Sequence, residues 1–152
     1  VYWTQGLIAR GLMERGGRVF AMTSTGSHEV SPSYGVVSAA KAALERVTRD
    51  CGHELETFGA ATVSIWPSFV TTERMLALDA EEWGLDLDGA ESPRFTGRGI
   101  AAILCDKHRM EKSGRVFTTL QLAQEYGFVD VDGSLPRGAP DPGDPGPLLA
   151  PA

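Results

Sequence analysis

The amino-acid sequence predicts an α/β fold built on a doubly wound parallel sheet, and three observations support this prediction. Helical and strand patterns alternate along the chain, in the order helix, strand, helix, strand, helix, strand. The strand segments are short and almost continuously apolar, as expected for strands that are covered on both faces. A helical segment separates each pair of successive strands, which is the connection that parallel strands require. We therefore expect helices on both faces of the sheet.

Three helical segments are expected, at residues 1–14, 33–58 and 96–106. The first ends before Gly16-Gly17, which suit a carboxyl-terminal cap, and Thr96 is a suitable N-cap for the third. The long second segment carries an apolar stripe that is typical of an amphipathic helix packed on a core. The members of this stripe are Val37, Ala40, Leu44, Val47, Cys51, Leu55 and Phe58.

Three strands are expected, at residues 18–23, 61–66 and 114–119, and a short helical turn, LQLAQEYG, follows the last of them. Pro67 ends the second strand because proline cannot donate a ladder hydrogen bond. The carboxylates of the acidic stretch 79–91, which comes before the third helix, are expected to be solvated.

The two ends of the chain differ in character. Residue 1 lies inside a helical pattern, and a sheet of three strands leaves an apolar edge open, so we expect strands that precede this sequence. Six of the nine prolines lie in residues 136–152, and this density of Pro and Gly predicts a disordered tail over 134–152. The expected folding unit is therefore residues 1–133.

Composition and charge exclude several classes of function. The chain has 152 residues, enough for one domain, and its net charge of −6 without a basic cluster argues against nucleic acid or an anionic membrane as partner. No apolar run approaches the roughly 18 residues of a membrane span, and the expected location is cytoplasmic. The three histidines lack metal-ligand spacing, so no metal site is predicted. Cys51 and Cys105 are expected to be reduced, although one disulfide is formally open.

A tyrosine and a lysine form the strongest candidate for chemistry. Tyr34 and Lys41 are seven residues apart near the start of the long helix, which places them on nearly the same face. Helical side chains lean toward the N-terminus, so Lys41 extends toward Tyr34. An ammonium group beside a phenol stabilises the phenolate, which makes the tyrosine a general acid for an oxygen that gains negative charge. The alternative is a surface lysine and a half-buried tyrosine that share a face without function.

Polar residues at the ends of two strands are expected to join this pair. Thr23 and Ser24 end the first strand, and the segment 67–72 ends the second. In open α/β sheets, ligands bind beyond the carboxyl ends of the strands, so these groups converge on one crevice. The alternative for Thr23 and Ser24 is ordinary turn chemistry.

The chain resembles the C-terminal half of a short-chain dehydrogenase/reductase over residues 1–133. The segments RVFAMTSTGS, PSYGVVSAAKAALE and WPSFVTTE carry the resemblance. It implies the C-terminal part of a Rossmann-type sheet, with Tyr34 as proton donor, Lys41 assisting it and binding the nicotinamide ribose, and Thr23 or Ser24 orienting the substrate. The family's Pro-Gly-x-x-x-Thr segment, which holds the nicotinamide carboxamide and phosphates, matches cofactor-binding positions Pro67, Ser68, Val70 and Thr72.

The sequence departs from the family pattern at several positions. The Tyr-x6-Lys spacing resembles the enoyl-acyl-carrier-protein reductase-like branch, but Ser24 stands where that branch places a second tyrosine. Ser68 replaces the usual glycine and Thr23 the usual serine. The glycine-rich phosphate loop of the N-terminal βαβαβ half is absent from this sequence, so we expect the chain alone to bind dinucleotide weakly or not at all.

The resemblance implies an NAD- or NADP-dependent oxidoreductase acting on a small-molecule carbonyl, alcohol or enoyl substrate. In the family, the region after the Thr72 position is the substrate lid, and its apolar lining here would be Leu76, Leu78 and Trp83. The long helix 33–58 would form a homodimer or homotetramer contact. The competing hypothesis is a non-catalytic family member that acts only as a dimerisation or scaffold module.

Overall fold

The computed structural model describes residues 1–13, 16–28, 34–78, 81 and 87–143, and its centre is a parallel sheet of three strands. The strands are β1 (Arg18–Met22), β2 (Ala61–Trp66) and β3 (Arg115–Thr118), in the spatial order β1-β2-β3. Arg18 pairs with Ala61 and Val63 pairs with Arg115, both in parallel register. The predicted parallel α/β sheet is confirmed.

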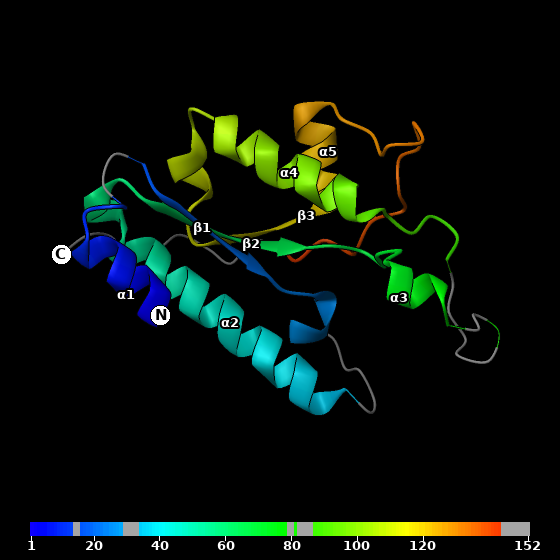
Figure 1. Ribbon diagram of the computed structural model, residues 1–152, viewed down its shortest axis with the longest axis horizontal. Helices are drawn as coiled ribbons and strands as arrows, with labels where there is room; N and C mark the ends of the chain where they lie inside the picture. Colours follow the sequence, from blue (N-terminus) through cyan, green and yellow to red (C-terminus); the bar gives the residue numbers. More distant parts are fainter. Residues whose placement is uncertain (14–15, 29–33, 79–80, 82–86, 144–152) are drawn as a thin grey trace.

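Helices cover both faces of the sheet (Figure 1). α1 (Tyr2–Ala9) and α2 (Gly35–Glu54) lie on one face, and α4 (Pro93–Cys105) and α5 (Thr119–Tyr126) lie on the other. Shorter elements connect them: η1 (Thr25–Ser27), η2 (Glu56–Phe58), α3 (Glu73–Leu76) and η3 (Arg109–Lys112). Within the described part of the chain, none of the helices has the length and apolar character that crossing a bilayer requires.

Two hydrophobic clusters form the core, one on each side of the sheet. The larger cluster packs α4 and α5 against β2 and β3, and its buried members are Val63, Ile65, Ile103, Phe117 and Leu122. The smaller cluster joins the start of the chain to the end of α2 through Met13, Leu55 and Ala60. Burial of these apolar side chains is the main stabilising contribution to such a fold.

α1 ends at Ala9, earlier than the predicted end near Glu14. Gly11 has a φ of 66°. The Gly11 N–H donates to the carbonyl of Ile8 and the Leu12 N–H to that of Leu7, which is the Schellman pattern of a helix end. A left-handed glycine inside the apolar periodicity therefore ended the helix before Gly16-Gly17.

α4 begins at Pro93, so the prediction of Thr96 as its N-cap was wrong. Ser92 is the N-cap, and its hydroxyl accepts a hydrogen bond from the Phe95 N–H at 3.3 Å. Proline suits the first helical position because its missing N–H would have no helical partner there. Thr96 is a buried residue of the first turns instead.

α2 packs only partly with the predicted face: Leu55 of the apolar stripe is buried, and Cys51 packs against the smaller core cluster. Its buried residues are Glu45, Thr48 and Gly52, whereas Val37, Leu44 and Val47 of the apolar stripe are exposed. The physical reason is close approach. A Cβ on Gly52 would lie 2.7 Å from the Cα of Gly114, the residue just before β3, so only the small, polar face of the helix fits against the sheet. The helix also ends at Glu54, with η2 covering the remainder of the predicted range.

The described part of the predicted tail, residues 134–143, has no helix or strand but contacts the domain. The Arg137 N–H donates to the carbonyl of Gly89 at 2.9 Å, and Pro136 is buried. The boundary at residue 133 stays a prediction, and residues 144–152 lie outside the described part of the chain.

Candidate functional site

The parallel register brings the ends of the strands to one edge of the sheet. Met22 pairs with Ile65 and Trp66 pairs with Thr118, so the residues that follow β1 and β2 emerge side by side. The Thr23 N–H extends this pairing by donating to the carbonyl of Ile65 at 2.9 Å. This is the carboxyl edge, where open α/β sheets bind ligands.

Lys41 reaches this edge from α2. Its Nζ donates to the carbonyl of Met22 at 2.7 Å, one residue before Thr23. An ammonium group carries three donors, so two remain for other partners. The structure thus brings the predicted lysine to the end of β1.

Tyr34 lies at the start of α2, as its N-cap residue. Its carbonyl accepts from the Ser38 N–H at 2.8 Å, and the side chain is 60% exposed. No hydrogen bond joins the Tyr34 hydroxyl to Lys41 among the residues that the structure describes. Tyr34 and Lys41 therefore lie in the N-terminal turns of one helix, and of the two side chains only Lys41 is seen to hydrogen-bond to the sheet, at the Met22 carbonyl.

The two hydroxyls after β1 differ in their surroundings. Thr23 is buried, and its Oγ1 lies 3.4 Å from the carbonyl oxygen of Ile65. Ser24 is half-buried and precedes η1, where its carbonyl accepts from the Ser27 N–H at 3.0 Å. Ser24 is thus the more accessible of the two.

A buried carboxylate, Glu45, links the two loops at this edge. Its Oε1 accepts from the Ser27 hydroxyl at 2.5 Å and from the indole N–H of Trp66, and its Oε2 lies 2.9 Å from Nε2 of His28. The His28 ring also meets Trp66 edge-on, with ring centroids 5.0 Å apart. Sequence reasoning missed Glu45. The available signal was its place four residues after Lys41, on the same helix face.

The segment 67–72 follows β2 and holds the four predicted cofactor-binding positions, Pro67, Ser68, Val70 and Thr72. Pro67 and Val70 are half-buried. Thr72 caps α3, since its Oγ1 accepts from the Met75 N–H at 3.3 Å. The segment is therefore ordered, with part of its surface accessible.

Glu91 holds this segment through buried hydrogen bonds, so the prediction that the carboxylates of 79–91 are solvated is wrong for this residue. Its side chain is 0% exposed. Ser68 donates to its Oε2 through both the backbone N–H, at 2.9 Å, and the hydroxyl, at 3.0 Å. The composition of an acidic stretch predicts exposed carboxylates. The burial of Glu91 depends on contacts with residues distant in sequence, which composition does not show.

The predicted lid is described only in part. Leu76 is exposed and Leu78 is half-buried, whereas Trp83 lies outside the described residues.

Both cysteines are free thiols, and partial burial raises the pKa of Cys51, with nearby carboxylates adding to the shift. Among the described residues, no three metal-ligating side chains come together.

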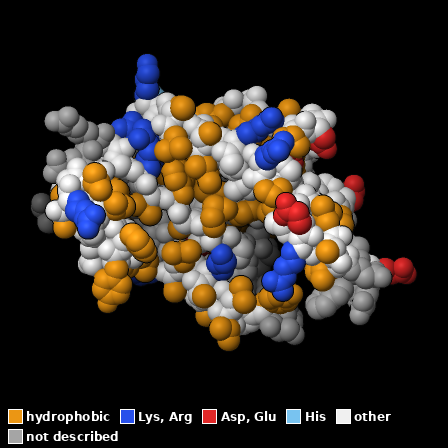
Figure 2. All heavy atoms as spheres, viewed as in Figure 1, with side chains coloured by type: hydrophobic (Ala, Val, Ile, Leu, Met, Phe, Trp, Pro, Cys, Tyr) orange, Lys and Arg blue, Asp and Glu red, His pale blue; other side chains and the backbone are white. Residues whose placement is uncertain are grey.

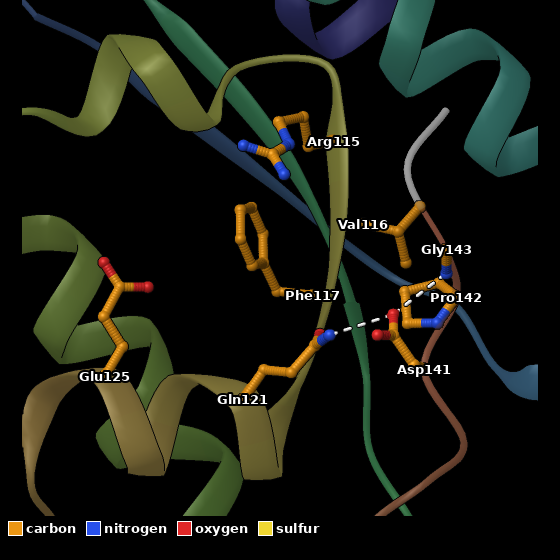
Figure 3. Close-up of a pocket in the computed structure, with 8 residues that line it drawn as sticks. All are labelled: Arg115, Val116, Phe117, Gln121, Glu125, Asp141, Pro142 and Gly143. Atoms are coloured by element: carbon orange, nitrogen blue, oxygen red, sulfur yellow. Dashed lines mark hydrogen bonds between the residues drawn. The ribbon is translucent and has the colours of Figure 1, made fainter. Parts of the chain in front are cut away.

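Two hollows lie elsewhere on the sheet, one beside β3 and one along β1. One, of about 280 Å³, lies between β3, α5 and the described end of the tail (Figure 3). There the Gln121 amide donates to Asp141 at 3.0 Å. The other, of about 330 Å³, is a groove between α1 and α2 lined by Val19, Leu44, Val47 and Cys51 among others. Neither is lined by Tyr34, Lys41 or the segment 67–72.

Comparison with known proteins places the chain in one family. Residues 3–94 match a family model described as enoyl-(acyl carrier protein) reductase. The chain is similar to "dehydrogenase/reductase SDR family member 1" of Mus musculus, with 34% identity over 129 residues, which is 77% of this chain. It spans 40% of that relative's length.

Solved structures share the fold. An enoyl-[acyl-carrier-protein] reductase (NADH) from Aquifex aeolicus superposes with a TM-score of 0.58 and 24% identity, over 78% of this chain and 46% of that one. A 7α-hydroxysteroid dehydrogenase, complexed with NADH and 7-oxo glycochenodeoxycholic acid, gives a TM-score of 0.57 and 18% identity, over 79% and 45%. Since the family model matches more than half of the chain, the chain belongs to the short-chain dehydrogenase/reductase family.

Proposed function

We propose that this chain carries the catalytic part of an NAD- or NADP-dependent oxidoreductase of the short-chain dehydrogenase/reductase family. The observation that carries the proposal is the approach of Lys41 to the end of β1, 2.7 Å from the Met22 carbonyl. The ammonium group thus lies at the carbonyl that directly precedes Thr23, at the edge where such sheets bind ligands, which supports the proposal. The whole protein's activity is proposed here because the chain spans 40% of its relative.

Tyr34 is the general acid and base of the proposed reaction. Its exposed hydroxyl gives a proton to the substrate oxygen during reduction and takes it back during oxidation. The Lys41 ammonium stabilises the phenolate that remains after the proton has left. Ser24, the more accessible of the two hydroxyls after β1, orients the substrate by a hydrogen bond, and Thr23 supports the end of the strand.

The residues present fit the nicotinamide end of a dinucleotide. Lys41 has two further donors for the ribose, and Pro67, Ser68, Val70 and Thr72 are half-buried, so part of the segment's surface is accessible to the carboxamide and phosphate. The bound nicotinamide supplies or accepts the hydride. Tyr34 gives the one proton that neutralises the charge on the substrate oxygen, and its phenolate then regains a proton from solvent.

The substrate is a small molecule with a carbonyl, alcohol or conjugated enoyl group. The Tyr-x6-Lys spacing and the matching family model favour the enoyl-reductase-like branch. Ser24, where that branch places a second tyrosine, leaves the carbonyl and alcohol reaction as the alternative.

The exposed apolar stripe of α2 supports a homodimer or homotetramer. Val37, Leu44 and Val47 are exposed, and hydrophobic side chains are spread over the face of the molecule viewed in Figure 2. An exposed contiguous apolar patch commonly marks an interaction site. The same observation favours the second candidate function, a non-catalytic dimerisation or scaffold module. Only a measurement of enzymatic turnover therefore distinguishes the two candidates.

The decisive test begins with the coding sequence upstream of Val1. If an in-frame glycine-rich phosphate loop is found there, the extended protein is assayed for NADH and NADPH turnover with carbonyl and enoyl-thioester substrates. We expect Tyr34→Phe and Lys41→Ala each to lower turnover by about 10²-fold or more, the usual size of a general acid–base contribution.

Lys107→Ala is the matched control, because Lys107 is exposed and lies beyond α4. Substitution of an exposed residue changes the unfolding free energy by less than about 0.5 kcal/mol, so Lys107→Ala and Tyr34→Phe should fold. Lys41 is half-buried and loses one hydrogen bond in Lys41→Ala, so circular dichroism checks that this variant folds. Unchanged turnover in both Tyr34→Phe and Lys41→Ala would contradict the catalytic roles of these residues. Absence of turnover in the unaltered extended protein would leave the dimerisation module as the function.

A further inference from the structure

Glu91 is the most deeply buried of the acidic side chains that the structure describes. Its carboxylate joins three parts of the fold that meet at the carboxyl edge. Oε2 accepts from Ser68, after β2, and from the hydroxyl of Thr119, the first residue of α5, at 2.5 Å. Oε1 accepts from the hydroxyl of Thr96 in α4 at 2.5 Å. The side chain therefore has four donors and no contact with solvent.

The backbone of Glu91 also forms hydrogen bonds with the segment that follows β2. Its N–H donates to the carbonyl of Phe69 at 2.8 Å, and its carbonyl accepts from the Thr71 N–H at 2.9 Å. The Thr71 hydroxyl adds a bond to this carbonyl at 3.1 Å, and Val70 forms a parallel bridge with Glu91. Residues 68–71 are thus clamped by one residue through both its main chain and its side chain.

We propose that Glu91 is a positioning residue, which holds the segment 67–72 in the conformation that receives the nicotinamide end of the cofactor, with Ser68 as its direct partner. This inference rests on the proposed function, because the segment's role in cofactor binding is part of that function. Glu91 itself is buried beneath the segment and does not touch the cofactor.

The chemistry of the contacts explains why a carboxylate stands at this position. An ionised carboxylate only accepts hydrogen bonds and has about four lone-pair sites, which match the four donors here. Removing it leaves buried donors without partners, which costs more than the bonds themselves contribute. An amide in its place keeps one accepting oxygen for Ser68, and the Thr96 hydroxyl can rotate to accept from the amide nitrogen.

The pair also explains the serine that replaces the family's glycine. The Ser68 hydroxyl points to Glu91 rather than away from it, so its Oγ is directed into the fold. The side chain therefore does not narrow the accessible side of the segment. Ser68 and Glu91 act as one unit, which predicts that their substitutions are not independent.

The test uses Glu91→Ala, Glu91→Gln and Ser68→Gly, with Asp130→Ala as the matched control. Asp130 is also a buried carboxylate, and it binds the N–H and hydroxyl of Ser92 without touching the segment 67–72. Hydrogen exchange of the amides of residues 68–72 is measured on the 152-residue chain. Dissociation constants for NADH and NADPH are measured on the extended protein defined above.

We expect Glu91→Ala to speed exchange of the Ser68 amide at least tenfold and to weaken cofactor binding at least tenfold. Glu91→Gln should fold and show a smaller effect on both, and Asp130→Ala should leave exchange of residues 68–72 and cofactor binding within about twofold. In the double variant with Ser68→Gly, the loss of affinity should be clearly less than the product of the two single losses, as for residues in contact.

Two results would overturn the inference. One is cofactor affinity within twofold of the unaltered protein in Glu91→Gln and in folded Glu91→Ala. The other is slow exchange of the Ser68 amide in both variants. Failure of the unaltered extended protein to bind either cofactor would contradict the proposed function instead, and the exchange measurement would still decide whether Glu91 holds the segment.

Discussion

At the residue scale, buried or half-buried carboxylates of the described structure accept hydrogen bonds from residues that are distant in sequence. Glu45 joins the loop after β1 to Trp66, Glu91 joins three elements, and Asp106 accepts from the hydroxyl of Tyr126 at 2.5 Å. Each carboxylate satisfies donors that would otherwise lose water on burial. The candidate site is therefore held in place by groups that the sequence presents only as scattered charges.

The Asp106–Tyr126 pair predicts loss of stability at both ends of the pH range. The hydrogen bond from Tyr126, followed by one from the backbone of His108, lowers the pKa of Asp106 below its ordinary 3.8. Burial and the hydrogen bond to Asp106 raise the pKa of Tyr126 to about 12. The contribution of Asp106 to the free energy of unfolding is complete above pH 3.8 and is lost as the pH falls through the pKa of Asp106 in the folded protein. The tyrosine's contribution is complete below its ordinary 10 and is lost as the pH rises toward 12.

Urea unfolding of the 152-residue chain at pH 3, 7 and 11 checks this prediction. Tyr126→Phe should be less stable than the unaltered chain at pH 7, and should lose less further stability between pH 7 and 11. An equal alkaline loss in both proteins would show that Tyr126 is not the group responsible.

At the element scale, packing rather than periodicity decides which face of α2 is buried. Glu45, Thr48 and Gly52 are buried, whereas Val37, Leu44 and Val47 of the apolar stripe are exposed. Gly52 sets this arrangement because its missing side chain lets the helix approach Gly114. An amphipathic pattern identified the helix correctly but could not identify which neighbour each of its faces would meet.

Gly52→Ala should destabilise the chain by about 1–3 kcal/mol, the typical cost of overpacking a close contact. The added Cβ would lie 2.7 Å from the backbone of Gly114, which cannot move aside as a flexible side chain can. Gly97→Ala is the control. Gly97 lies in α4 with nothing within 4 Å of an added Cβ, so alanine there should stabilise by about 0.5–1 kcal/mol. Thermal unfolding of the two variants measures the contrast, and equal effects would contradict the close-packing account.

At the scale of the whole molecule, the described sheet has β1 at one edge and β3 at the other. The described end of the tail lies near β3, where Asp141 accepts from Gln121 (Figure 3). β1 has an unpaired edge in the described chain. An exposed apolar edge strand is a template for pairing with another chain.

The 152-residue chain by itself should not bind NAD or NADP with micromolar affinity. Pyrophosphate is held by backbone N–H groups of a glycine-rich loop at a helix N-terminus, and this sequence contains no such loop. Several charge-assisted bonds, each worth about 1.5–3 kcal/mol, are then missing from the roughly 8 kcal/mol of a micromolar complex. Titration calorimetry on the purified chain is the measurement. A dissociation constant at or below micromolar for either cofactor would mean that dinucleotide binding resides in the residues present here.

The sequence by itself determined the class of fold, the three strands and the family, because these depend on local patterns and on motifs such as YGVVSAAK that are contiguous in the chain. It also placed Lys41 near the end of β1, since a residue on the first turns of a crossover helix must meet the strand that precedes it. The tertiary structure alone decided that Glu45 and Glu91 are buried and accept hydrogen bonds from distant segments, and that Ser92 rather than Thr96 caps α4. It also decided that Val37, Leu44 and Val47 of the apolar stripe of α2 are exposed. These outcomes depend on which residues approach from elsewhere in the chain: a carboxylate is buried only where several donors converge on it, and no local pattern records that convergence.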